Sequence, residues 1–317
     1  MKSKLDLSII VPLYNEQESI IPLYNKTNPV LLKLKESYEI IFVDDGSTDK
    51  SLENLRILQK KQSNIRIIVL RKNFGQSAAI NAGFSIARGG IFIVIDADLQ
   101  NDPDDIPKLL AKVNKGYDLV SGWRHKREDP FSKRIFSKIS NWMHRRLTGL
   151  DIHDSGCSLK AYKRESVENL ELYGEMHRYI PALIAAKGFK VGEIIVKHHQ
   201  RMYGKSKYGN ARVIKGFLDL LYIHFLTKYS SRPLHFFGYL GLLQIIAGIV
   251  IGLLKIIGLY REYIKSGTAQ FGPLLLFSGI LVIIGTLFVM FGFLAELMIR
   301  AHYQNAKNRN YNIKEII

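Results

Sequence analysis

The stretch Ile91-Phe-Ile-Val-Ile-Asp96-Ala-Asp98-Leu-Gln100 places five apolar, mostly β-branched residues directly before two carboxylates and an amide. A short apolar run that ends in polar residues is typical of a buried strand that leads into a loop. Carboxylate and amide oxygens are the ligands that hard divalent cations prefer in proteins. The stretch therefore predicts a strand that delivers Asp96, Asp98 and Gln100 to a cation site.

Two earlier segments repeat this arrangement. Residues 7–12 lead into Tyr14-Asn15-Glu16, and residues 39–43 lead into Asp44-Asp45-Gly46-Ser47-Thr48-Asp49. In an open α/β sheet, ligands bind outside the carboxyl ends of the strands. We expect the three acidic loops to meet in one crevice, which suits a nucleotide diphosphate held by Mg²⁺ or Mn²⁺.

Strand and helix patterns alternate regularly over residues 5–122. Such alternation predicts an α/β fold with a mostly parallel sheet covered by helices. The expected strands lie near 7–12, 39–43, 65–70, 91–95 and 117–121, and the expected helices near 16–36, 48–61, 75–88 and 103–115. Further along, the patterns predict a basic helical segment at 124–150, a helix at 174–187 and a strand at 190–198.

Two segments near the carboxyl terminus, 234–254 and 271–295, contain no Asp, Glu, Lys or Arg. Each is long enough to cross a hydrocarbon core of about 30 Å at about 1.5 Å per residue. Buried helices of soluble proteins seldom run this far without a charge. The sequence predicts two transmembrane helices, at about 234–257 and 271–298.

The segment just before the first span has apolar residues at helical spacing, with charged residues between them. This pattern predicts an amphipathic helix in the membrane interface. The expected organisation is a cytosolic α/β domain over 1–209, the interfacial helix over 210–231, and the two spans with a cytosolic tail over 232–317.

The amino terminus lacks the continuous apolar core of a signal peptide, and Cys157 is the single cysteine. Both features agree with an α/β domain that lies in a reducing compartment. Basic residues flank the outer ends of the two spans, as the positive-inside rule expects for cytosolic ends. We predict a multi-pass protein of the inner or plasma membrane with both termini in the cytosol.

The formal net charge is +17, from 45 Lys and Arg against 28 Asp and Glu. Basic residues gather between Arg124 and Arg146 and again between Lys197 and Lys215, just before the first span. Basic clusters beside a bilayer favour anionic lipid surfaces and lipid phosphates. No known nucleic-acid-binding motif accompanies the charge, so nucleic acid is not an expected partner.

Six ordered motifs extend over nearly the whole chain: Pro12-Leu-Tyr14-Asn-Glu16, Val43-Asp-Asp45-Gly-Ser, Asn73-Phe-Gly75-Gln, Asp96-Ala-Asp98-Leu-Gln100, Asp154-Ser-Gly-Cys-Ser-Leu-Lys160 and Arg201-x-x-Gly204-x-Ser206-Lys207-Tyr208. With these motifs the chain resembles the inverting polyprenyl-phosphate glycosyltransferases of family 2. That group includes dolichol-phosphate mannose synthase and bacterial undecaprenyl-phosphate sugar synthases with two spans. The resemblance implies a GT-A, Rossmann-like catalytic domain and a homo-oligomer, with a tetramer suspected.

The resemblance also implies roles for individual residues. The nucleoside would be held by Pro12, Tyr14, Glu16, Val43 and Asp45. The diphosphate and metal would meet Asp96, Ala97 and Asp98, with Gln100 as an additional metal ligand. Phosphate groups of the donor and of the lipid acceptor would contact Arg124, Arg201 and Lys207.

Asp154 corresponds to the aspartate that the family is proposed to use as a general base, and with Asp98 it is a catalytic candidate. The acceptor, however, would be a phosphate monoester with a second pKa of about 6, which is largely ionised at pH 7. Two roles therefore stay open for Asp154: a base, or a group that orients the acceptor or binds a sugar hydroxyl.

The expected reaction transfers one sugar from a nucleotide sugar to undecaprenyl or another polyprenyl phosphate with inversion, for cell-envelope glycans. UDP-glucose and UDP-N-acetylglucosamine are favoured over GDP-mannose. One alternative is a processive polysaccharide synthase, but the Gln-x-x-Arg-Trp signature is absent and two spans make a poor channel. A second alternative is a non-catalytic, lipid-binding membrane scaffold, against which the intact acidic and basic motifs argue.

Overall fold

The structure, a computed structural model, describes residues 5–125, 145–146, 148–168, 170, 172, 174–203, 222, 224–225, 228–229, 232–268 and 272–305. Lys207, most of the predicted interfacial helix over 210–231 and most of the basic segment over 124–150 lie outside these ranges. The chain divides into two compact units, residues 1–224 and residues 225–317.

The described residues form one seven-stranded sheet in the order β3-β2-β1-β4-β6-β5-β7. Neighbouring strands are parallel except around β6, which runs antiparallel to both β4 and β5. The prediction of an α/β fold with a mostly parallel sheet is confirmed. The strands are β1 (Leu5–Leu13), β2 (Tyr38–Asp44), β3 (Ile65–Val69), β4 (Gly89–Val94), β5 (Leu119–Trp123), β6 (Lys160–Lys163) and β7 (Val191–Ile195).

Strand β6 was not expected from the sequence. It has only four residues, begins and ends with lysine, and shows no apolar alternation of useful length. It pairs with β4 on one side and β5 on the other, so the sheet supplies the partners that stabilise it. A strand this short is decided by tertiary pairing rather than by local sequence.

Most helices of the first unit lie close to the expected positions, although the short helix over 164–167 was not expected and the one expected over 103–115 is divided in two. The helices are α1 (Ile20–Leu34), α2 (Ser51–Lys61), α3 (Gln76–Ile86), η1 (Pro103–Asp105), α4 (Ile106–Val113), α6 (Arg164–Val167), η2 (Met176–Arg178) and α7 (Ile180–Ala186). The helix predicted from residue 16 begins at Ile20, because the preceding loop bonds to the start of α2, where Glu16 N donates to Ser51 Oγ at 2.9 Å. The helix predicted over 174–187 is split, with Pro181 in the first turn of α7, where proline is tolerated.

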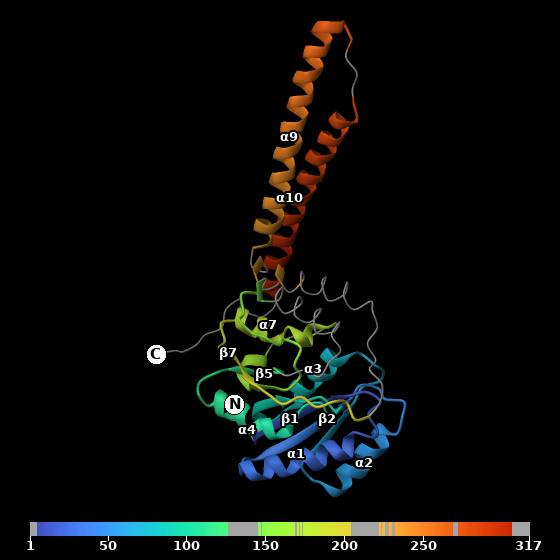
Figure 1. Cartoon of the computed structure of the whole chain (residues 1–317), viewed down its shortest axis with the longest axis vertical. Helices are drawn as coiled ribbons and strands as arrows, with labels where there is room; N and C mark the ends of the chain where they lie inside the picture. The colour runs from blue at the N-terminus through green and yellow to red at the C-terminus, as the bar shows by residue number, and fades with distance from the viewer. Residues whose placement is uncertain are drawn as a thin grey trace. The chain divides into compact units, whose positions relative to one another are not determined.

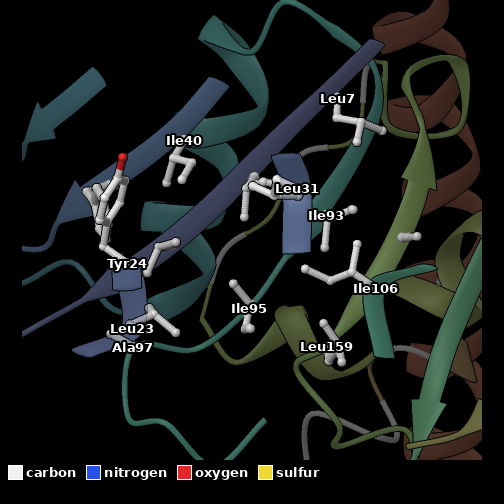
Figure 2. Close-up of a cluster of buried hydrophobic side chains, with 14 of the residues drawn as sticks. Leu7, Leu23, Tyr24, Leu31, Ile40, Ile93, Ile95, Ala97, Ile106 and Leu159 are labelled. Carbon is white, nitrogen blue, oxygen red and sulfur yellow. The ribbon is translucent and has the colours of Figure 1, made fainter. Parts of the chain in front are cut away.

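Alternation along the central strands gives the sheet two apolar faces. Ile9, Ile40 and Ile93 lie in register and belong to one core cluster with side chains of α1, α2 and α4. Figure 2 shows part of this cluster, and Figure 1 shows α1 and α2 together along the sheet. On the other face, α3 comes so close that a Cβ added at Gly83 would lie 2.4 Å from Ile10.

The second unit contains two long helices, α9 (Pro233–Ser266) and α10 (Pro273–Asn305), which pair lengthwise (Figure 1). Both are long and apolar enough to cross a membrane. Both continue past the carboxyl ends of the predicted spans, although α10 begins two residues after its predicted start. Most of their apolar side chains are not buried, and Leu276 for example is 74% exposed, which a bilayer would cover.

Small residues allow α9 and α10 to approach closely. A Cβ added at Gly241 would lie 2.5 Å from the carbonyl oxygen of Gly285, and one added at Gly248 would lie 2.7 Å from that of Ser278. Glycines at such crossings are typical of helix pairs in membranes, where packing rather than the hydrophobic effect drives association. The two helices therefore form a hairpin suited to a bilayer.

Candidate active site

The loop after β4 presents its polar side chains on one side only. Ile95, Ala97 and Leu99 are buried in the core, where Figure 2 shows the first two, whereas Asp96, Asp98 and Gln100 are half-buried. Leu99 has a φ of 62°, a left-handed conformation that is unusual for a branched side chain. Backbone strain of this kind concentrates at functional sites. The core thus holds the loop while its carboxylates face outward.

Burial and a neighbouring carboxylate disfavour the ionisation of both Asp96 and Asp98. Burial raises the pKa of Asp98 to about 6, with the Asp96 carboxylate as the next contribution. Burial also raises the pKa of Asp96, although a hydrogen bond from Ser158 and the charges of Lys160 and Arg124 oppose the change. A divalent cation would relieve both the repulsion and the lost hydration.

Arg201 brings three separate segments together at this point. Its Nη1 lies 3.8 Å from Asp98 Oδ2, its Nη2 pairs with Glu16 Oε1, and its Nε donates to the carbonyl of Tyr203 at 2.8 Å. Glu16 follows β1, Asp98 follows β4 and Arg201 follows β7. This geometry agrees with the expectation that Glu16, Asp98 and Arg201 lie at one site.

The loops after β1 and β2 are joined by local hydrogen bonds. Asn15 N donates to Ser47 Oγ at 2.8 Å, and Thr48 N donates to Asn15 Oδ1 at 2.8 Å. Tyr14 is half-buried on the first loop. Pro12 and Val43 are paired in register and both buried, one residue before their strands end. The residues expected to hold a nucleoside thus share one edge of the sheet.

Asp45, expected at the nucleoside, has both carboxylate oxygens engaged by the protein itself. Oδ1 accepts from Phe74 N at 2.7 Å, and Oδ2 accepts from Gly75 N at 2.8 Å. The residue is 4% exposed. Each oxygen retains a further lone pair for a ligand. In this structure Asp45 anchors the loop that precedes α3.

Arg124 and Asp154 form a buried, two-point ion pair. Arg124 Nε donates to Oδ2 at 2.7 Å and Nη2 donates to Oδ1 at 2.9 Å, while the backbone N of Arg124 lies 3.3 Å from Oδ2. The side chains are 14% and 4% exposed. Arg124 directly follows β5, and Asp154 lies in the loop before β6. Fork-to-carboxylate pairing of this kind fixes the guanidinium plane.

Three residues without a predicted role lie next to these groups. Gln76 Nε2 donates to Asp96 Oδ1 at 2.7 Å. Ser158 bonds to Asp96 from the loop before β6 and accepts from Asn101 at 2.8 Å. Lys160 is buried and donates to the carbonyls of Ser155 and Cys157. All three residues lie within the motifs quoted above, and this was the signal in the sequence that could have pointed to them. The spacing of the motifs does not reveal which residues they contact.

Residues 8–171 match the family model described as glycosyl transferase family 2. The chain is also 38% identical over 317 residues to dodecaprenyl-phosphate galacturonate synthase from Rhizobium johnstonii, covering 98% of this chain and 93% of that protein. The chain belongs to glycosyl transferase family 2. A second relative of this glycosyltransferase is undecaprenyl-phosphate 4-deoxy-4-formamido-L-arabinose transferase from Salmonella choleraesuis, 35% identical over 312 residues with 98% and 93% coverage.

The expected resemblance to polyprenyl-phosphate sugar transferases is thereby confirmed. The GT-A-like fold of this family 2 glycosyltransferase also agrees with solved structures. Glucosyl-3-phosphoglycerate synthase from Mycobacterium tuberculosis, solved with Mn²⁺, UDP-glucose and phosphoglyceric acid, aligns with a TM-score of 0.55 and 18% identity, covering 70% of this chain and 80% of that one. At this identity the likeness concerns the fold alone.

The donor set of this glycosyltransferase fits a hard divalent cation. Across the described ranges, no three His, Cys, Asp or Glu side chains group around a point that would hold a metal ion. Asp96 and Asp98 supply two carboxylates, and Gln100 donates from Nε2 to the carbonyl of His199 at 3.4 Å, which leaves its amide oxygen as an acceptor. Mg²⁺ commonly takes one or two carboxylates and completes its shell with substrate phosphates and water.

Proposed function

We propose that the protein transfers a single sugar from a nucleotide sugar to the phosphate of a polyprenol, with inversion of the anomeric carbon. The observation that carries this proposal is the convergence of an acidic pair, Asp96 and Asp98, with the cations Arg124 and Arg201 at the carboxyl edge of the sheet. Carboxylates suit a metal-bound diphosphate, and guanidinium groups suit phosphate. The near full-length relatives named for polyprenyl-phosphate sugars support the same reading.

On the donor side, Asp96, Asp98 and Gln100 would hold Mg²⁺ or Mn²⁺, which would neutralise the charge that builds on the departing diphosphate. Arg201 would contact the same phosphates, and the 3.8 Å separation of its guanidinium from Asp98 supports this role. The nucleoside would lie over the loops after β1 and β2, where Pro12, Tyr14, Glu16, Val43 and Asp45 are the expected contacts, with Ala97 beside the diphosphate.

On the acceptor side, Arg124 would bind the lipid phosphate, and Lys207, outside the described residues, is expected to assist. A phosphate oxygen would form the new bond to the anomeric carbon as the bond to the nucleotide diphosphate breaks. The acceptor is largely ionised at pH 7, since its second pKa is about 6. Both oxygens of Asp154 already accept from Arg124. We therefore assign Asp154 the role of orienting Arg124 rather than that of a base.

The sugar donors are predicted from the sequence. UDP-glucose and UDP-N-acetylglucosamine remain the predicted donors, whereas the two relatives are named for galacturonate and for 4-deoxy-4-formamido-L-arabinose. The hairpin of α9 and α10 would anchor the protein in the inner membrane with the catalytic unit and both termini in the cytosol. A homotetramer is the proposed assembly.

The direct test incubates membranes containing the full-length protein with undecaprenyl phosphate and a panel of labelled nucleotide sugars that includes UDP-galacturonate and UDP-4-deoxy-4-formamido-L-arabinose. We expect one donor to give a lipid product with a single sugar, and EDTA to abolish it. A ladder of saccharides would indicate a processive synthase. Absence of product from every donor would favour a non-catalytic membrane protein.

A further inference from the structure

The turn through which the chain enters α3 contacts three parts of the protein that are far apart in the sequence. The N–H groups of Phe74 and Gly75 bond to Asp45 after β2. Gln76 donates to Asp96 after β4, 20 residues away. Ser77 bonds to His177, 100 residues away. This turn, residues 74–77, therefore links the loop expected at the nucleoside with the carboxylate expected at the diphosphate.

The backbone of this turn is held firmly. Gly75 has a φ of 93°, a conformation that favours glycine, although a Cβ there would meet no atom within 4 Å. The glycine is thus needed for its backbone angle rather than for space. Asp45 bonds to two consecutive N–H groups, which fixes the direction in which the chain enters α3.

Ser77 secures the other side of the turn. The backbone N of His177 donates to Ser77 Oγ at 3.0 Å, and Ser77 Oγ lies 3.1 Å from His177 Nδ1. Burial, reinforced by the charges of Arg178 and Lys160, lowers the pKa of His177 to about 3. The ring is therefore neutral at physiological pH, so Nδ1 is able to accept the hydroxyl hydrogen. Both neighbours of Gln76 are fixed by these contacts.

The chemistry of the Gln76 contact suits orientation rather than charge balance. An amide N–H donates to a carboxylate without adding a charge, and it does not titrate. Gln76 donates to Oδ1 of Asp96 at 2.7 Å and, together with the hydrogen bond from Ser158, restricts rotation of the carboxylate, whose oxygens keep further lone pairs for a ligand. Partners of this kind, bonded to a metal ligand rather than to the metal, orient the ligand and tune the site.

We propose that Gln76 is a positioning residue that orients the Asp96 carboxylate for the metal–diphosphate. Asp45, by its hydrogen bonds to the backbone of residues 74–75, fixes the position of Gln76. This inference rests on the proposed function, because it assigns Asp96 to the metal–diphosphate. It adds a residue to which the sequence motifs assign no role, and it connects the nucleoside loop to the metal loop.

The test uses purified full-length protein and Mn²⁺ alone, with free Mn²⁺ measured by electron paramagnetic resonance. Gln76→Ala removes the side chain, and Gln76→Met keeps its length without the donor. Ser85→Ala, in an exposed position of the same helix, is the matched control. We expect both Gln76 variants to bind Mn²⁺ about 10-fold more weakly or worse, the range for loss of such a partner, while the control binds like the wild type.

Transfer assays provide a second readout, the Mn²⁺ concentration needed for half-maximal turnover. A positioning role predicts that this concentration rises in both Gln76 variants and that excess Mn²⁺ restores turnover, with the KM for polyprenyl phosphate unchanged. A purely structural defect would not be rescued by metal. Wild-type affinity in Gln76→Met alone would show that packing, not the hydrogen bond, matters, and would overturn the inference. So would an inability of the wild-type chain to bind Mn²⁺.

The two proposals fail separately. A wild-type chain that binds Mn²⁺ but makes no lipid-linked sugar would contradict the proposed function and leave the Gln76–Mn²⁺ result standing. A wild-type chain that makes the product while Gln76→Ala binds Mn²⁺ normally would contradict the inference about Gln76 and leave the function intact.

Discussion

A buried carboxylate and a half-buried one, at opposite ends of the same mostly parallel sheet, have pKa values that move in opposite directions. Glu39 lies near the amino end of β2, and Asp98 lies beyond the carboxyl end of β4. Burial by itself would raise the pKa of each of these carboxyl groups. At Glu39, hydrogen bonds from Ser8 and two arginines outweigh burial and hold the pKa below its ordinary 4.5, whereas at Asp98 burial and the Asp96 charge raise it to about 6.

The contacts explain the difference. Glu39 accepts from Ser8 Oγ and from the backbone N of Arg88 at 2.7 Å each, and Arg66 and Arg88 both lie 3.0 Å from its Oε2. Its charge is fully compensated within the protein. Asp98 has the more distant Arg201 at 3.8 Å and a second carboxylate nearby. One end of the sheet neutralises its charge to hold the fold, and the other keeps charge available for a ligand.

The largest expected effect is at the carboxyl end. Asp98→Asn should lower sugar transfer about 100- to 1,000-fold, the range for removing one group that stabilises developing charge. Its thermal midpoint should stay close to that of the wild type, because the ionised carboxylate is disfavoured in the folded protein. Labelled-sugar transfer measures the loss of activity, and a thermal melt of the same preparation measures the thermal midpoint. Near-normal turnover would remove Asp98 from the metal site.

The next effect concerns the Arg124–Asp154 pair. Asp154→Asn should raise the KM for polyprenyl phosphate about 10- to 100-fold, which corresponds to losing a charged hydrogen bond of roughly 1.5 to 3 kcal/mol. If Asp154 acts by orienting Arg124, then Arg124→Lys made in that background should add little. Additive losses, or a kcat that falls while KM and the lipid affinity hold steady, would favour the general-base role instead.

At the amino end of the sheet, a substitution is expected to change stability rather than transfer activity. Glu39→Gln should destabilise the protein by about 2 kcal/mol, because Arg66 and Arg88 lose their charged acceptor, although both arginines are partly exposed. Transfer activity at saturating substrates should remain normal. Glu53→Gln, at an exposed position in the first turn of α2, is the matched control for thermal melts. A fall in activity without a fall in stability would contradict a structural role for Glu39.

The smallest expected effect is the pH dependence of the stabilisation that Glu39 provides. Because the pKa of Glu39 is lower in the folded protein than in the unfolded chain, its contribution is present above about pH 4.5 and is lost as pH falls through the folded-state pKa. The difference in thermal midpoint between the wild type and Glu39→Gln should therefore shrink below pH 4.5. A difference that stays constant down to pH 3 would mean that the Glu39 charge is not what stabilises the fold.

Sequence patterns predicted the parts of the fold that local chemistry decides. Apolar runs placed β1, β2 and β4, and the polar residues after them marked the loops that meet at one edge. Strand β6 was missed because its four residues have no independent signal. The break between η2 and α7 was also missed, although Pro181 indicated where a helix would begin.

In the candidate site, too, the sequence predicted some features and only the structure showed others. The acidic and basic residues were identifiable from their types and motifs. Their partners were not, because Arg124 meets Asp154 across 30 residues and Arg201 meets Glu16 across 185. Gln76 had no predicted role, since nothing in its local pattern indicates that it reaches Asp96.

By itself, the sequence determined the α/β class, the carboxylate-bearing loops, the two apolar helices and the family. Each of these follows from local periodicity, composition or motif, which need no knowledge of distant neighbours. Only the tertiary structure decided which charges are compensated. Whether a buried carboxylate serves stability or chemistry depends on the groups within a few ångströms of it, and the fold brings those groups together from strands far apart in the chain.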